Sequence, residues 1–395
     1  MNGQAKKYTV FIGSLIPEKK INDYKTISFN TADNIAQNTI VSGLHDRLGD
    51  RLIVITEVSN RRLKSLKLDC GVRARVVRSV GLNRSIYYLS LMYGYTIELL
   101  SVFRSINNDA EVTVLSRGSY IFIAIPILIA RLRRRFKWVP FVITTVEVPE
   151  YGFPLSIISK MSRWTTNKAD GMITYVAGSA HDYMTNKPFL EIVYSINSKL
   201  AKKYSTYTPI KPKKFTITYT GSLSNAYNFE IIFDAIRETG QTYRWVFAGI
   251  GQYQSALESL AKDQRYDVDY VGFLSNTEAS EVQMSSSLLI SLKGGTNEKI
   301  NQYYNKYAAS AKITEYLYAG VPILASDIPS VHERLRPFLS LIEPKSGHQL
   351  VKKIESIRRD YEAKKKIAKR GQAYAQEYLC SENQNKMIWG FLDQL

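Results

Sequence analysis

The stretch Ser310-Ala-Lys-Ile-Thr-Glu-Tyr-Leu-Tyr-Ala-Gly-Val-Pro-Ile-Leu-Ala-Ser-Asp327 decides the fold of the second half of the chain. Its apolar residues recur at helical spacing, and Gly320 followed by Pro322 ends the helix. The apolar run 321–325 has the length and the β-branched character of a buried strand. The stretch therefore predicts a short helix that leads at once into a strand.

The N-terminus of this predicted helix suits an anionic group. Residues 310–312 lie in its first turn, where free N–H groups and the lysine side chain can bind a diphosphate. Glu315 lies one turn further on, where its carboxylate can accept hydrogen bonds from vicinal hydroxyl groups. A capped amphipathic helix without any ligand explains the same spacing.

The order Lys312-x-x-Glu315-Tyr316-x-x-x-Gly320-x-Pro322-Ile323, then Ala325-Ser326-Asp327, resembles the donor-nucleotide segment of family 4 retaining glycosyltransferases. The resemblance implies an α/β fold of the GT-B type, with two Rossmann-like domains facing a cleft and a last helix that crosses back to the first domain. It also implies that Glu315 binds the ribose of a nucleotide sugar. Ser310, Ala311 and Lys312 would then face the diphosphate.

Other parts of the second half extend the resemblance. The strand 216–220 and the following Gly221-Ser222-Leu223-Ser224 resemble the first strand and donor loop of the family's second domain. The basic pair often found there is replaced by Ser222 and Tyr227. The diphosphate would therefore depend mainly on the helix end and Lys312.

Further donor contacts are expected in loops of the same half. Gly249 and Gly251 form a tight turn after the strand 244–248, and Phe273 lies in the loop that commonly meets the base in this family. The polar loop 293–307 is expected to meet the sugar, through Asn301, Tyr304 and Asn305. Tyr307 stands where the family often has a second glutamate that contacts the donor sugar.

The first half opens with a strand at 8–15, a small-residue segment at 28–34 and a helix at 35–48, the first unit of a nucleotide-type fold. In related enzymes this loop lies against the donor phosphate. It contains no glycine here, so a close approach of the backbone would rely on Ser28, Asn30, Thr31 and Ala32. Glu147 follows the predicted strand 140–146 and is a candidate catalytic residue; no nucleophile is assigned.

We expect an N-terminal acceptor-side domain at 1–205, a linker at 206–214, a donor domain at 215–375 and a crossover helix at 376–395. A chain of 395 residues can hold two such domains. Cys70 and Cys380 are the only cysteines, which excludes a disulfide scaffold and suits the cytoplasm. The first residues do not resemble a secretion signal.

The net charge of +18 is uneven, since residues 1–205 hold 29 Lys and Arg against 15 Asp and Glu. An anionic membrane surface, nucleic acid or only solvent can match such a surface. No nucleic-acid-binding module is recognisable. The apolar run 119–130 leads into the cationic stretch 131–137 and Trp138. This is either a membrane-surface element or a buried crossover helix with a charged end.

The sequence therefore predicts a retaining glycosyltransferase, a hexosyltransferase that needs no cofactor. Asp267-Val-Asp269 has the spacing of a metal-binding motif but precedes a strand in the wrong domain, so no metal is expected. The expected donor is a nucleotide sugar, with UDP favoured over GDP. The expected acceptor is a lipid-linked saccharide at the inner face of a bacterial membrane, in the building of a surface polysaccharide. A protein glycosyltransferase and a non-catalytic GT-B partner subunit that binds sugar or peptide remain alternatives.

Overall fold

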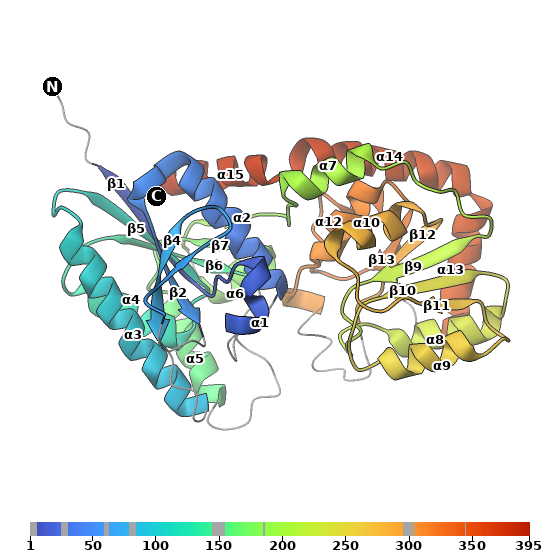
Figure 1. Ribbon diagram of the computed structural model, residues 1–395, viewed down its shortest axis with the longest axis horizontal. Helices are drawn as coiled ribbons and strands as arrows, with labels where there is room; N and C mark the ends of the chain where they lie inside the picture. Colours follow the sequence, from blue (N-terminus) through green and yellow to red (C-terminus); the bar gives the residue numbers. More distant parts are fainter. Residues whose placement is uncertain are drawn as a thin grey trace. The chain divides into compact units, whose positions relative to one another are not determined.

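The computed structural model describes residues 6–24, 31–58, 63–78, 84–143, 155–184, 186–294, 302, 305–343 and 345–395. The chain divides into two compact units, each with its own parallel sheet. The N-terminal unit comprises Met1–Ile192 and Gln384–Leu395. The C-terminal unit comprises Val193–Asn383. Each is an α/β unit with helices on both faces of its sheet, as Figure 1 shows, so the predicted pair of Rossmann-like domains is confirmed.

The sheet of the N-terminal unit has the strand order β3-β4-β2-β1-β5-β6-β7-β8. All neighbouring strands are parallel except β3, which runs antiparallel to β4. The strands are β1 (Lys7–Gly13), β2 (Leu52–Val58), β3 (Ser65–Lys67), β4 (Arg73–Arg78), β5 (Glu111–Arg117), β6 (Lys137–Val142), β7 (Met172–Thr174) and β8 (Phe189–Glu191).

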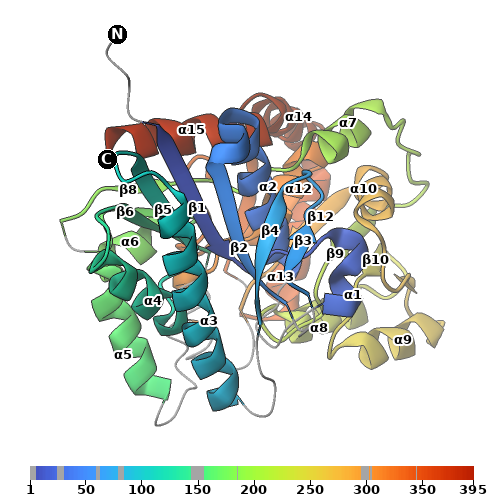
Figure 2. The ribbon, with the colours of Figure 1, turned by 60° about the vertical axis from the view of Figure 1, so that its left-hand side comes forward.

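Helices cover both faces of this sheet (Figure 2). They are α1 (Ile21–Tyr24), α2 (Thr31–Leu48), α3 (Arg84–Ser105), α4 (Ile121–Arg131), α5 (Leu155–Thr166), α6 (Ala177–Tyr183) and the end of α15 (Ser381–Gln394). The inner faces of α3 and α4 form one core with the central strands, in which Leu91, Leu99 and Ile127 are fully buried. Gly94 brings α3 against β4, because a Cβ there would lie 2.5 Å from Val77 Cγ1.

The sheet of the C-terminal unit has the order β11-β10-β9-β12-β13-β14, and all its strand pairs are parallel. The strands are β9 (Thr216–Thr220), β10 (Arg244–Ala248), β11 (Val268–Tyr270), β12 (Leu288–Ser291), β13 (Ile323–Ser326) and β14 (Ser340–Ile342). The helices are α7 (Ser198–Thr206), α8 (Phe229–Thr239), α9 (Gln254–Lys262), α10 (Asn276–Met284), α12 (Ala311–Ala319), α13 (Gly347–Arg359) and α14 (Tyr361–Tyr378).

The units meet at other positions than the sequence suggested. The division falls after Ile192 rather than at the expected linker 206–214, because Ser198–Thr206, expected at the end of the first domain, form helix α7 of the C-terminal unit. The side chain of Asn197 caps α7, and Tyr204 is buried in a core cluster with residues of α12. The C-terminal segment rejoins the N-terminal unit from Gln384, where Asp393 forms ion pairs with Lys7 and Arg47.

The stretch 119–138 is a crossover element of the sheet. Helix α4 buries Ile123, Ile127 and Ala130, so the apolar run belongs to the core. Trp138 lies in β6, which begins before the strand predicted at 140–146, and is fully buried with its indole N–H donated to Ser116 Oγ at 2.8 Å. The expectation that Trp138 could lie at a membrane surface is therefore wrong.

In both sheets, the order in which the chain adds strands reverses near the middle of the sheet. The N-terminal unit winds outward from β1 to β4 and then returns to β5 beside β1; the C-terminal unit winds from β9 to β11 and returns to β12 beside β9. Open α/β sheets bind ligands beyond the carboxyl ends of the strands at such topological switch points. The residues that follow β1 and β5 in one unit, and β9 and β12 in the other, are therefore the places to look for a site.

Candidate functional site

Helix α12 and strand β13 have the predicted local structure. Gly320 ends the helix in the left-handed conformation, with φ of 65°, and β13 begins at Ile323. The helix is fixed against the switch point of the C-terminal unit, because the Tyr316 hydroxyl accepts a hydrogen bond of 2.9 Å from the backbone N–H of Thr220, the last residue of β9. The first turn of α12 is therefore held beside the carboxyl end of a central strand.

Glu315 is held in this corner by neighbouring polar groups. The carboxylate interacts with Gln283, whose amide donates to Thr220 Oγ1 at 2.8 Å and whose oxygen accepts from Tyr204 at 2.6 Å. Burial raises the pKa of Glu315 to about 7, against the opposing effects of Lys312 and Gln283. Such a carboxylate, partly exposed and beside a lysine, suits recognition of hydroxyl groups.

Lys312 is 8% exposed and points from the first turn of α12 toward β9. Its Nζ lies 3.6 Å from the ring centroid of Tyr219 and 4.2 Å from that of Tyr227. The same atom forms no hydrogen bond within the part of the chain that the structure describes. Burial lowers the pKa of Lys312 well below its usual value, Glu315 opposes this shift and Lys293 adds to it.

The predicted glycines pack backbone against backbone beyond β9 and β10. A Cβ on Gly249 would lie 1.8 Å from the carbonyl oxygen of Gly221, and one on Gly251 would lie 2.4 Å from that of Leu223. All three predicted glycines have positive φ, 135° at Gly221, 139° at Gly249 and 154° at Gly251. Only glycine fits this close approach, which brings the two loops together at the edge of the sheet.

The other predicted donor residues of this unit differ in their exposure and contacts. Ser222 accepts a 2.5 Å hydrogen bond from Tyr219 through its carbonyl, and Phe273 is 74% exposed beyond β11. The side-chain oxygen of Asn305 is buried without a hydrogen bond among the described residues. The ring of Tyr307 lies 5.0 Å from Lys306 Nζ. Asn301 and Tyr304 lie outside the described residues.

The predicted residues of the N-terminal unit are less informative. Thr31 and Ala32 begin helix α2, but their side chains are outside the described part of the chain. Ser28, Asn30 and Glu147 also lie outside it. Their predicted roles stay predictions.

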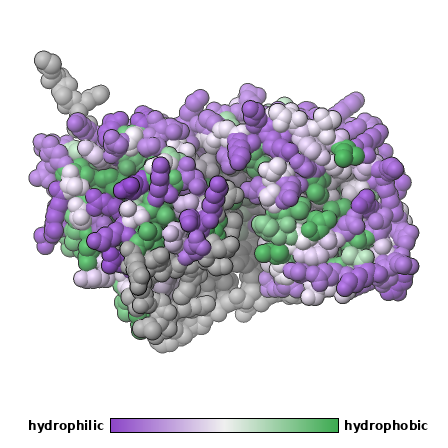
Figure 3. Space-filling view, viewed as in Figure 1, coloured by the Kyte–Doolittle hydropathy of each residue, from purple (hydrophilic) through white to green (hydrophobic). Residues whose placement is uncertain are grey.

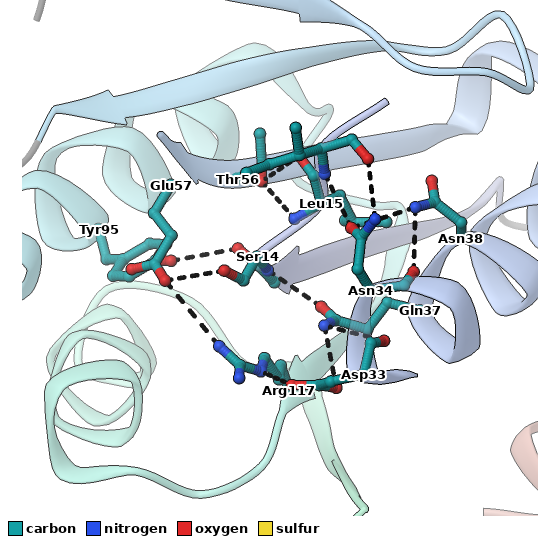
Figure 4. Close-up of polar contacts among 12 residues, drawn as sticks. Ser14, Leu15, Asp33, Asn34, Gln37, Asn38, Thr56, Glu57, Tyr95 and Arg117 are labelled. Carbon is teal, nitrogen blue, oxygen red and sulfur yellow. Dashed lines mark hydrogen bonds and ion pairs between the residues drawn. The ribbon is translucent and has the colours of Figure 1, made fainter. Parts of the chain in front are cut away.

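The switch point of the N-terminal unit contains a buried ionic network that the sequence analysis missed (Figure 4). Arg117, at the end of β5, forms an ion pair with Asp33 of α2, and its Nη1 lies 3.9 Å from the carboxylate of Glu57 in β2. Although burial lowers the pKa of Arg117, the neighbouring Asp33 raises it. Burial also raises the pKa of Asp33, against the effect of Arg117.

The same network fixes the turn that follows β1. The backbone N–H of Ser14 donates to Gln37 at 3.0 Å, that of Leu15 to Thr56 at 2.7 Å and that of Ile16 to Asn34 at 2.9 Å (Figure 4). Side chains of the protein therefore use the amides that, in a glycine-rich phosphate loop, would face the ligand. The amides of Ser14, Leu15 and Ile16 are therefore already hydrogen-bonded within the protein.

Two further groups bear on the chemistry. The carboxylates of Asp267 and Asp269 are paired with Lys214, at 2.7 Å, and with Arg244. Within the described residues, no group of three or more His, Cys, Asp or Glu side chains could hold a metal ion.

Lys293, just beyond β12, was not singled out from the sequence. A cation at the carboxyl end of a central strand is the signal that could have identified it.

Comparisons with known proteins agree with this architecture. Among solved structures, Anabaena HepE in complex with UDP superposes with a TM-score of 0.68 at 13% identity, over 98% of this chain and 100% of that one. Sucrose-phosphate synthase from Thermosynechococcus elongatus gives 0.71 at 13% identity, over 98% of both chains. A glycosyltransferase from Rickettsia africae gives 0.69 at 12% identity, over 98% and 100%. At such identities, the likeness defines the fold as GT-B.

The sequence comparison concerns the C-terminal unit. Residues 202–374 match the family of glycosyl transferases group 1. This segment contains the first turn of α12, Glu315, Lys312 and the glycine loops. No curated protein matches the chain in sequence. The domain match and the fold together support a glycosyltransferase of the GT-B class.

Proposed function

We propose that the protein transfers a sugar from a UDP-sugar to a saccharide acceptor, with the donor bound in the C-terminal unit. The observation that carries the proposal is the corner of α12, where Glu315 and Lys312 lie beside the carboxyl end of β9 inside the segment matched to glycosyl transferases group 1. Glu315 would bind the ribose hydroxyls. The first turn of α12 would face the diphosphate. The solved relative HepE binds UDP and UDP-glucose, which supports UDP as the nucleotide.

The base would lie over the loops beyond β10 and β11. Ile250 is 57% exposed and Phe273 is 74% exposed, although both are large and apolar. Exposed apolar side chains at the carboxyl edge of a sheet are suited to the flat face of a base. The Tyr270 hydroxyl fixes this edge by donating to the Gly249 carbonyl at 2.8 Å.

In the proposed reaction, the bond between C1 of the hexose and the β-phosphate oxygen breaks, and its electron pair leaves with the UDP. The acceptor oxygen forms the new bond to C1 on the same face, with retention, and its proton passes to the departing phosphate oxygen. The diphosphate gains negative charge in the transition state, so cations and a helix N-terminus that face it stabilise that state. We assign this stabilisation to the protein alone and propose that the reaction needs neither a metal ion nor a cofactor.

We further propose that the acceptor is lipid-linked and that the N-terminal unit contacts the inner, anionic face of a membrane during synthesis of a surface polysaccharide. Arg133, Arg135 and Lys137 are exposed beyond α4, whereas Arg134 donates to backbone carbonyls at 106–110 and serves the fold. Each exposed cation would contribute about 1 kcal/mol at a membrane surface. The cation cluster therefore supports peripheral, salt-sensitive binding.

Helix α3 supplies an apolar surface in the same unit. Its residues Ser85–Ser105 are long and apolar enough to cross a membrane, by length and composition only. The helix is a crossover of the sheet, since Leu91 and Leu99 are buried, but Leu89 and Tyr93 are 64% and 72% exposed on its outer face. Figure 3 shows apolar atoms among hydrophilic ones over this part of the unit.

A screen of nucleotide sugars tests the enzymatic proposal. The protein is incubated with UDP-glucose, UDP-galactose, UDP-N-acetylglucosamine and GDP-mannose, and release of the nucleoside diphosphate is measured. We expect release from a UDP-sugar, and none from the Lys312→Met variant. Release from no donor by the wild-type protein would favour a non-catalytic subunit instead. The anomeric configuration of the product, from NMR, tests retention.

Vesicle co-sedimentation tests the membrane proposal. We expect binding that needs anionic lipid, weakens with salt and falls in the Arg133→Ser, Arg135→Ser double variant. The matched control is Arg265→Ser, which removes an exposed arginine from the C-terminal unit. Equal recovery in the supernatant with and without anionic vesicles at low salt contradicts the proposal and leaves a soluble acceptor, such as a protein.

A further inference from the structure

The donor loop at the switch point of the C-terminal unit carries no cation of its own. Residues 221–224 read Gly-Ser-Leu-Ser, and the next aromatic residue, Tyr227, is partly buried and packs against Lys312. A bound diphosphate carries at least two negative charges, which a helix N-terminus of about half a charge does not balance. Balancing charge has to come from elsewhere in the unit.

Lys293 provides a second cation at this switch point. It lies just beyond β12, is 8% exposed and donates from Nζ to the carbonyl of Ala308. Its own carbonyl accepts from Ser326 Oγ at 2.8 Å and from Asn228 Nδ2 at 3.1 Å, so its backbone is held in place. An isolated β-bridge joins it to Tyr227.

Both lysines lie near Tyr227. The ammonium of Lys312 lies over the ring of this tyrosine, and the backbone of Lys293 is bridged to the backbone of Tyr227. A Cβ on Gly221 would lie 2.8 Å from Lys312 Nζ, which places this ammonium directly at the donor loop. The charge of Lys293 is near enough to lower the pKa of Lys312.

Neither ammonium has a carboxylate within ion-pair distance among the described residues; Glu315 acts on Lys312 only as a nearby charge. A buried charge without a counterion is destabilising, and two like charges add repulsion. Proteins rarely retain such an arrangement for stability alone. An anion that enters the corner would remove the cost.

We propose that Lys293 and Lys312 together bind the diphosphate of the nucleotide sugar, as the cation pair that the donor loop lacks. This assignment rests on the proposed function. It adds Lys293 as a second diphosphate-binding residue and assigns each lysine its own direction of approach. Lys312 reaches the diphosphate from the first turn of α12, and Lys293 from the end of β12. Helix α12 holds the Lys312 side chain, and the end of β12 holds that of Lys293, so both charges are in place before the donor binds.

Calorimetry with UDP, inorganic pyrophosphate and uridine tests the pair in Lys293→Met and Lys312→Met. We expect each variant to lose at least tenfold in affinity for UDP and for pyrophosphate, and to bind uridine as the wild type does. The control is Lys214→Met, whose lysine pairs with Asp267 away from this corner and should not change UDP affinity. The ligand-free melting temperature of both variants should equal or exceed that of the wild type, because an apolar side chain replaces an unpaired buried charge.

The outcomes separate this inference from the donor assignment. UDP affinity within twofold of the wild type in both variants overturns the lysine pair, as does an equal loss of uridine binding. A wild-type protein that binds pyrophosphate through the lysines but prefers no uridine nucleotide upholds the pair and removes UDP from the proposed function. A wild-type protein that binds none of the three ligands overturns both.

Discussion

The two units place a buried cation at the same point of the same kind of sheet, yet give it opposite surroundings. In the N-terminal unit, Arg117 at the end of β5 is paired with Asp33 and lies near Glu57. In the C-terminal unit, the Lys312 ammonium lies against two aromatic rings beside β9, without a hydrogen bond among the described residues. One cation is already neutralised within the protein, and the other is not.

The difference teaches how to distinguish a support from a site. A paired cation whose neighbours also bind the backbone of a turn, as around Ser14 and Leu15, fixes structure. An unpaired cation beside loops that only glycine can form is prepared for an anion that comes from outside. We therefore assign the donor to the C-terminal unit and expect the N-terminal switch point to contribute shape rather than charge.

The largest expected effect is on folding. Arg117→Met leaves Asp33 and Glu57 buried without their cation, and we expect a loss of about 3–5 kcal/mol in the free energy of unfolding. Urea denaturation followed by circular dichroism measures it. The control Arg244→Met breaks an exposed pair with Asp269 and should cost at most about 1 kcal/mol. Equal losses in the two variants would show that the network is not a structural support.

Removal of the Glu315 carboxylate should weaken the binding of UDP. We expect Glu315→Ala to weaken UDP binding by roughly 1.5–3 kcal/mol, the range for a hydrogen bond to a charged group. Calorimetry gives the value, with the exposed Glu355→Ala as the control. Unchanged UDP affinity in a folded Glu315→Ala protein would remove the ribose assignment. Arg117→Met, where it remains folded, should bind UDP normally.

The lysine pair should make UDP binding depend on pH. Burial lowers the pKa of Lys293 to about 8, and its charge acts on that of Lys312, which lies over the rings of Tyr219 and Tyr227 and near Glu315. A lowered pKa means that Lys293 loses its proton as the pH rises through 8, so an anion then binds less tightly. From this titration we expect about a tenfold fall in UDP affinity between pH 7 and pH 9.

The same experiment in Lys293→Met should show a clearly smaller dependence on pH. Proton uptake on UDP binding at pH 8.5, measured in buffers of different ionisation enthalpy, is the matching observation. A wild-type affinity that stays constant over this range contradicts the role of Lys293 as the titrating cation.

Ionisation of Glu315 should make the ligand-free protein less stable as the pH rises. Burial raises the folded-state pKa of Glu315 from 4.5 to about 7. Its favourable contribution is thus complete below pH 4.5 and is lost as the pH rises through 7. In the ligand-free protein, Glu315→Gln should therefore reduce the fall in melting temperature between pH 5 and pH 8. An unaltered pH profile in this variant would show that the carboxylate titrates normally.

The smallest expected effect is that of metal removal. If lysines and the end of α12 balance the diphosphate, EDTA should leave sugar transfer and UDP affinity unchanged. Turnover abolished by EDTA and restored by manganese or magnesium would show that the charge comes from a metal ion. If a metal ion supplies the charge, the Lys293→Met variant should transfer sugar as fast as the wild type when the metal is present.

Much of the fold could be predicted because its signals are local. The expected strand 216–220 has the bounds of β9, and the pair Gly320 and Pro322 marks the end of α12. The domain boundary was expected near 205 because the lysines of α7 conceal the buried Tyr204 that holds this helix in the C-terminal unit. The sequence left the position of Trp138 open, because burial of an aromatic residue next to a run of arginines is decided by the strand that it joins.

The candidate residues that sequence could suggest belong to one continuous motif, and those it missed come from distant segments. Glu315 and Lys312 belong to one helix, and the resemblance of that helix to a known donor segment, rather than its spacing alone, suggested their roles. Lys293 becomes notable only when β12 lies next to β9, and Arg117 only when β5 lies next to β1. Whether a charge is paired depends on residues as far apart as Asp33 and Arg117, which sequence order does not bring together.

The comparison of the two switch points is tested most directly by hydrogen–deuterium exchange with and without UDP. The account predicts that UDP slows exchange in peptides that cover residues 219–228 and 308–320. Peptides that cover residues 7–16 and 111–118 should stay as they are, because side chains of the protein already satisfy the amides of Ser14, Leu15 and Ile16. Protection confined to the N-terminal peptides, or absent from those of α12, would contradict the assignment of the donor to the C-terminal unit.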